Sequence, residues 1–121
     1  MRWLAFVAPL AAVGCTTAEE VSREPIRWSA VYPVAWEDLA NCVARAASHT
    51  YRVTPLLNTR QRSAEVIIAI REGEIVQFIF EVKGLDGDRS EIALKRKKMA
   101  MDIEGIEAEQ RTNAERCGSR V

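Results

Sequence analysis

Hydrophobic and polar positions along the chain follow two different periods, and these separate one clear helix from a series of strands. Residues 35–48 carry apolar side chains at intervals of three and four, which predicts an amphipathic helix. The stripe consists of Trp36, Leu39, Ala40, Val43 and Ala47. Glu37 and Asp38 fall in the first turn, where the helix dipole favours negative charge. Residues 27–32, ahead of this helix, are aromatic and β-branched and predict a short strand that ends at Pro33.

Four further segments are predicted as strands after the helix. They are residues 51–57, 64–71, 75–83 and 89–97. Pro55 cannot donate a ladder hydrogen bond, so the first of these is expected at the edge of a sheet. The second is almost continuously apolar, as expected for a more central strand. The last alternates, with Ile92 and Leu94 facing inward, and short connections that contain glycine predict an antiparallel meander.

The C-terminal segment predicts a second helix with a weaker apolar face. Asp102 is a suitable N-cap and Gly118 a suitable stop. One face carries Ile103, Ile106, Gln110, Ala114 and Cys117, of which two are large apolar residues. The order of elements predicts an α+β fold: an antiparallel sheet of four or five strands with two helices packed on one face.

The N-terminal segment has the pattern of an export signal. Arg2 is followed by an uncharged run from Trp3 to Val13 and then by Gly14 and Cys15. Eleven helical residues extend only about 16 Å, roughly half the hydrocarbon core of a bilayer, so a permanent span is not expected. The alternatives are an ordinary signal peptide cleaved near Ala12, or a buried N-terminal helix.

The end of this run, Ala12-Val13-Gly14-Cys15, resembles the lipobox of bacterial lipoprotein precursors. The resemblance implies that residues 1–14 are removed and that Cys15 is diacylated and becomes the new N-terminus. Thr16 at the next position implies sorting to the outer membrane, with the protein on the periplasmic face. A soluble periplasmic or secreted protein is the alternative. Residues 15–26 are then expected to form a flexible tether, and residues 27–121 a single α+β domain.

Three cysteines are an odd number, and acylation of Cys15 would leave two. Cys42 and Cys117 are then expected to form a disulfide, because export places them in an oxidising compartment. The bond would restrain the weakly apolar C-terminal helix against the first helix. Free redox or catalytic thiols are the alternative, although there is no CxxC motif and no candidate base beside either cysteine.

A second resemblance concerns residues 28–97. The run YPVAWEDLANCVARAASHTYRV, followed by a polar turn and an apolar strand, is similar to the opening of helix-grip domains in small bacterial lipoproteins. That group includes lipoprotein subunits of the outer-membrane barrel-assembly machine. The resemblance implies an envelope role through contacts between proteins, and it transfers no catalytic residue.

Composition and charge exclude several classes of function. Seventeen basic and seventeen acidic side chains give a net charge of +0, so the basic field that nucleic-acid binding requires is missing. His49 is the only histidine, and its place at a helix end suits a partner for the helix dipole. The stretch from Asp86 to Ser90 fits a hairpin turn better than a calcium loop, since Glu91 and Lys97 occupy positions that require Gly and Glu. We therefore expect no enzyme, no metal and no cofactor.

The run Lys95, Arg96, Lys97 and Lys98 is the one concentrated charge feature. It is a candidate contact for anionic lipids, lipopolysaccharide or an acidic partner. The competing interpretation is a charge balance with the acidic residues downstream, together with protection of a strand end against edge pairing.

The sequence predicts a non-enzymatic, lipid-anchored envelope protein that contacts partner proteins or envelope polymers. Two alternatives stay open. One is a carrier of a small ligand in a cavity between helix and sheet, lined by Trp28, Trp36, Phe78 and Phe80. The other is an inhibitor or immunity-type lipoprotein.

Overall fold

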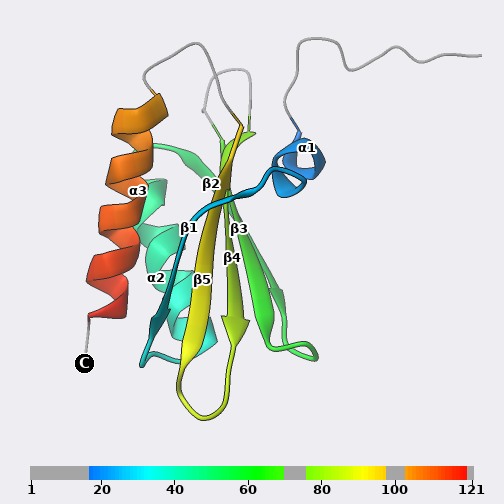
Figure 1. The fold of residues 1–121 in the computed structure, drawn as a ribbon, viewed down its shortest axis with the longest axis vertical. Coiled ribbons are helices and arrows are strands. Elements are labelled where there is room, and N and C mark those ends of the chain that lie inside the picture. Colours follow the sequence, from blue (N-terminus) through cyan, green and yellow to red (C-terminus); the bar gives the residue numbers. More distant parts are fainter. Residues whose placement is uncertain (1–16, 70–75, 98–102, 120–121) are drawn as a thin grey trace, which may run out of the picture.

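In a computed structural model, the chain is described over residues 17–69, 76–97 and 103–119. Some predictions concern positions outside these ranges, namely the signal segment 1–14, Cys15, Lys98 and Asp102. The described residues form one five-stranded antiparallel sheet with helices on both of its faces (Figure 1).

The strands of this sheet lie in the order β1-β5-β4-β3-β2. Their bounds are Ile26–Tyr32 (β1), Arg52–Asn58 (β2), Ser63–Ala69 (β3), Val76–Gly84 (β4) and Ser90–Arg96 (β5). Strands β2 to β5 are each neighbours of the next, which confirms the predicted meander, and β1 closes the other edge by pairing with β5. Pro55 lies in the edge strand β2, as its missing N–H group predicts.

Two helices, α2 (Trp36–Ser48) and α3 (Ile103–Gly118), cover the same face of the sheet, which we call the inner face (Figure 1). The core between them is continuous. It consists of the α2 stripe, the inward side chains of β3, β4 and β5, and two residues of α3: Trp36, Leu39, Ala40, Val43, Ala44, Ala47, Ala64, Val66, Ile68, Phe78, Phe80, Val82, Ile92, Leu94, Ala114 and Cys117. The predicted α+β class and the placement of two helices on one face are confirmed.

A third, short helix, α1 (Ala18–Ser22), lies on the opposite face, which we call the outer face. Its N-terminus is closed by a capping box, in which Thr17 and Glu20 satisfy each other's backbone N–H groups. Val21 is fully buried against Ala69 and Ile79. The expectation of a flexible tether is therefore wrong for residues 18–22, which form a helix packed on the sheet. The sequence does not predict this helix because Val21 is its one large apolar residue.

The last turn of α3 approaches β1 closely enough to require a residue without a side chain. A Cβ atom on Gly118 would lie 2.3 Å from Cγ of Tyr32, well inside van der Waals contact. Gly118 therefore allows α3 to continue past Cys117 while the Tyr32 ring packs against its backbone.

We predict that Gly118→Ala destabilises the fold by about 1–3 kcal/mol, since the added methyl group overpacks a filled contact. Denaturant unfolding under non-reducing conditions measures this. In a Tyr32→Ala background the same substitution should change the free energy of unfolding by less than about 0.5 kcal/mol, as for an uncrowded site. An equal cost in both backgrounds would contradict the proposed clash.

Candidate functional site

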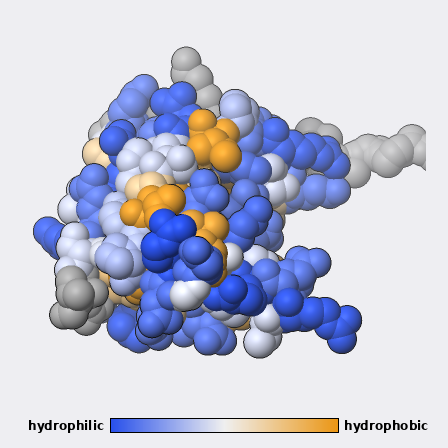
Figure 2. Space-filling view, turned by 60° about the horizontal axis from the view of Figure 1, so that its bottom comes forward, coloured by the Kyte–Doolittle hydropathy of each residue, from blue (hydrophilic) through white to orange (hydrophobic). Residues whose placement is uncertain are grey.

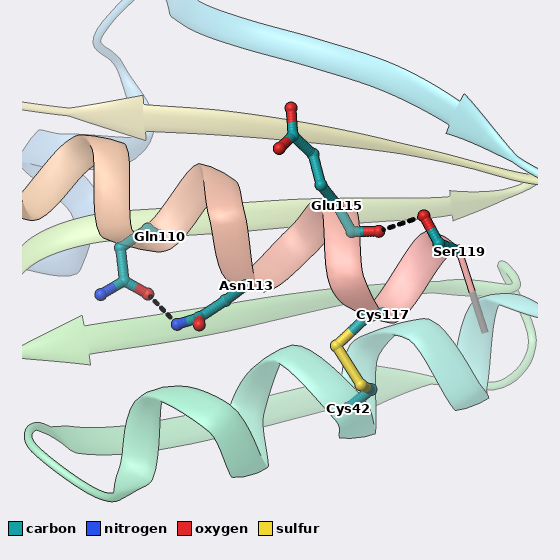
Figure 3. The surroundings of a disulfide bond; sticks show 6 residues. All are labelled: Cys42, Gln110, Asn113, Glu115, Cys117 and Ser119. Carbon is teal, nitrogen blue, oxygen red and sulfur yellow. Dashed lines mark hydrogen bonds between the residues drawn. A yellow bond between two sulfur atoms is a disulfide. The ribbon is translucent and has the colours of Figure 1, made fainter.

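A disulfide joins the two helices of the inner face (Figure 3). Cys42 lies in the middle of α2 and Cys117 in the last turn of α3, and their Cα atoms are 5.8 Å apart. The predicted pairing is confirmed. The alternative of two free thiols does not hold in this structure.

The bond compensates for a polar packing face on α3. Among the α3 side chains that the structure describes, from position 104 onward, those of Glu107, Gln110, Ala114 and Cys117 are buried. Ile106 is only partly buried. Gln110 is 0% exposed, and its Oε1 accepts a 3.4 Å hydrogen bond from Nδ2 of Asn113, while its Nε2 has no partner (Figure 3). Such a face gains little free energy from apolar burial, so the covalent restraint matters more here than on α2.

We predict that replacing both cysteines by alanine lowers the free energy of unfolding by about 4–5 kcal/mol, which is the chain-entropy value for a loop of this length. The bonded residues are separated by 75 positions. Denaturant curves of the oxidised protein, the reduced protein and the double variant measure the effect. The reduced protein and the variant should agree, and a loss below about 1 kcal/mol would contradict the proposed restraint.

Two shallow grooves flank the disulfide. One, of about 310 Å³, lies beside Val34, Asp38, Asn41 and Arg45. The other, of about 350 Å³, lies beside Ala46, Asn113 and Arg116. Both are lined by polar or charged side chains along with the cystine. They can contact a partner surface, but neither brings together a nucleophile with a base.

A buried ion pair links α3 to β5. Arg96 Nε is 2.7 Å from Glu107 Oε1, and both side chains are 8% exposed. The two atoms are in contact but not aligned as a hydrogen bond, and Arg96 Nη1 also lacks a partner. Arg27 at the start of β1 approaches the same carboxylate at 3.7 Å. This charge cluster lies inside the helix–sheet interface, where an unpaired charge would be costly.

We predict that Glu107→Leu destabilises the fold by about 3–5 kcal/mol, because it leaves the Arg96 guanidinium buried without its carboxylate. The double variant Arg96→Met/Glu107→Leu removes both charges and should recover most of that loss. Urea unfolding of both proteins with the disulfide intact measures the difference. If the double variant is less stable than the single variant, the interpretation is wrong.

The basic run at the end of β5 is divided between the two faces of the sheet. Lys95 Nζ contacts Glu81 at 3.0 Å and donates a 2.8 Å hydrogen bond to the carbonyl of Ser22 on the outer face. Lys97 Nζ is 3.5 Å from Glu20. Arg96 points inward, so its predicted contact with an anionic surface is wrong. Strand alternation causes this separation, and it could have been predicted from the parity that Arg96 shares with Ile92 and Leu94.

The two remaining positions considered for metal binding, Asp86 and His49, lie in a turn and at a helix end. Asp86 Oδ1 accepts hydrogen bonds from Arg89 at 3.2 and 2.9 Å, and Arg89 lowers the pKa of the Asp86 carboxyl below its usual value. That carboxylate belongs to the β4–β5 turn, where Gly87 has a φ of 62°.

His49 is exposed and is the C-cap of α2. Within the described ranges, no group of three or more His, Cys, Asp or Glu residues is placed to hold a metal ion.

The aromatic residues proposed for a ligand cavity belong to the core instead. Phe78 and Phe80 are 0% exposed and Trp36 is 6% exposed, all within one continuous cluster. Trp28 is partly buried at the margin, where the guanidinium carbon of Arg111 lies 5.7 Å from its ring centroid. These side chains fill the space between helix and sheet rather than line an opening.

Comparisons with known protein families, curated proteins and solved structures find no match to this chain. Over the described residues, no helix has the length and apolar character needed to cross a bilayer.

Proposed function

We propose that this chain is a non-enzymatic, lipid-anchored protein of the bacterial envelope, acylated at Cys15 and placed on the periplasmic face of the outer membrane. Support comes from the number of cysteines in the sequence, which is three. Cys42 and Cys117 are bonded to each other, which leaves Cys15 without a disulfide partner within the chain. That cysteine ends the lipobox-like run AVGC.

The protein acts by surface contact with another protein or an envelope polymer. The observation that carries this part of the proposal is the distribution of apolar side chains on the surface. In the described part of the chain, the large hydrophobic residues that remain exposed lie on the two edge strands: Ile26 and Val31 on β1, Leu56 and Leu57 on β2. Among the described strands, β1 and β2 each have a neighbour on one side only, and this suits the addition of a partner segment on the other side.

The rest of the visible surface is mostly hydrophilic. Figure 2 shows the end of the molecule that carries the strand turns, with only small, separate apolar areas among charged and polar side chains. A surface groove of about 520 Å³ follows β2 and the β2–β3 turn, beside Leu56, Leu57 and Asn58. Contacts of limited area at a sheet edge are favoured over enclosure of a ligand, because the inner face is filled by its own aromatic residues.

We predict that Cys15→Ser abolishes recovery of the protein in the membrane fraction, because it removes the acylation site and with it the anchoring free energy of about 0.8 kcal/mol per buried methylene. Fractionation of native envelopes measures the distribution. Mass spectrometry of the wild-type N-terminus should find Cys15 carrying diacylglycerol.

The control is the Cys42→Ala/Cys117→Ala variant. It should remain membrane-bound, since it loses stability but keeps the anchor. An unmodified Cys15, or a mature N-terminus elsewhere, would refute the proposed anchoring.

A further inference from the structure

The position of α1 leaves almost no slack between Cys15 and the folded domain. The N-cap of this helix is Thr17, two residues after Cys15. Two residues extend at most about 7 Å. A free chain from Cys15 to the first residue of β1 would instead span up to roughly 36–40 Å. The docked helix therefore determines how far the domain can lie from its anchor.

Several contacts hold α1 against the outer face of the sheet. Val21 is 0% exposed and packs with Ala69 and Ile79. Lys95 Nζ donates to the carbonyl of Ser22, which is the last residue of α1. Lys97 forms an ion pair with Glu20. The helix thus contacts β3, β4 and β5, and it is packed against the sheet.

These contacts lie at one end of the sheet. The start of β1, the end of β3, the start of β4 and the end of β5 meet there, next to α1 (Figure 1). The turns β2–β3 and β4–β5 lie at the opposite end, together with the last turn of α3. The seven residues of β5 separate the two ends by about 23 Å.

We infer that the end of the domain that carries α1 is its membrane-facing surface, and that the β2–β3 and β4–β5 turns point away from the bilayer. This inference rests on the proposed acylation of Cys15. The occupant of the α1 surface is the bilayer that holds the acyl chains of Cys15, because the two-residue connection keeps the N-terminus of the docked α1 within about 7 Å of the acylated cysteine.

The charges near α1 determine what kind of lipid this surface needs. Glu19 and Arg23 are 3.0 Å apart and highly exposed, and Glu20 is paired with Lys97. Lys95 is already paired with Glu81. Within the described residues, each of these three cations is thus paired with a carboxylate. We therefore expect the short covalent connection, rather than attraction to anionic lipid, to set the orientation.

The experiment compares how close two labelled positions of the protein lie to the lipid headgroups of one membrane. The mature lipoprotein is purified from envelopes with a fluorescent amino acid at position 23 or position 88, and reconstituted into phosphatidylcholine vesicles that contain a headgroup nitroxide lipid. Arg23 and Asp88 are both exposed, the first beside α1 and the second in the β4–β5 turn. Quenching should be roughly threefold or more stronger at position 23, given the separation of about 23 Å. Adding phosphatidylglycerol should leave this ratio unchanged.

Two variants test the cause of the orientation. Val21→Asp should release α1 and bring the ratio close to one, whereas Val31→Asp, an exposed valine on β1, should preserve it. If Val21→Asp does not fold, as judged by circular dichroism, ten Gly/Ser residues inserted between Thr16 and Thr17 provide the test. They span roughly 17 Å and should also reduce the ratio.

The outcomes separate this inference from the proposed function. A protein whose Cys15 is unmodified and that does not float with vesicles would refute the anchoring and the orientation together. An acylated, vesicle-bound protein with equal quenching at both positions would refute the orientation alone. An orientation that appears only with anionic lipid would also overturn it, since charge and not the short connection would then be the cause.

Discussion

The bond between Cys42 and Cys117 joins two helices that are held to the sheet in different ways. α2 buries six residues, all hydrophobic, and would pack on the inner face without help. α3 presents Glu107 and Gln110 among its buried residues and gains far less from apolar burial. Without α3, the guanidinium of Arg96 would lose Glu107, the carboxylate with which it forms a buried ion pair. The closed fold on this side therefore depends on one covalent bond and one buried ion pair.

The outer face has the opposite arrangement, in which a few weak contacts have a large geometric effect. α1 is five residues long and buries a single valine. Its contribution to global stability is small, on the order of the 1.5–3 kcal/mol gained by burying one such side chain. Yet because α1 immediately follows the proposed acylation site, those contacts determine whether the domain is held close to its anchor or moves on a chain of eleven residues. A small free energy of packing for α1 is enough to hold the domain close to the proposed acylation site, because Thr17 lies only two positions after Cys15.

Much of the fold could be predicted from hydrophobic periodicity, and the failures have a common physical origin. Strong patterns such as the α2 stripe and the apolar run of β3 gave the correct elements, and Pro55 gave the correct edge. The pairing of Cys42 with Cys117 was predictable because few cysteines were available. Helix α1 was missed because Val21 is a single apolar residue in a polar stretch. The pairing of β1 with β5 was not predicted, since it joins residues 58 to 69 positions apart and depends on tertiary context.

The candidate basic site shows why a run of charge in a sequence is a poor measure of charge on a surface. Successive side chains of a strand point to opposite faces, so Lys95 and Arg96 can never face the same partner. Each is matched by a carboxylate on its own face, Glu81 outside and Glu107 inside. The chain has a net charge of zero, and the charges of Lys95 and Arg96 on the two faces of β5 are likewise neutralised in pairs. The proposed partner contact would therefore use the exposed apolar residues of the edge strands rather than the basic run.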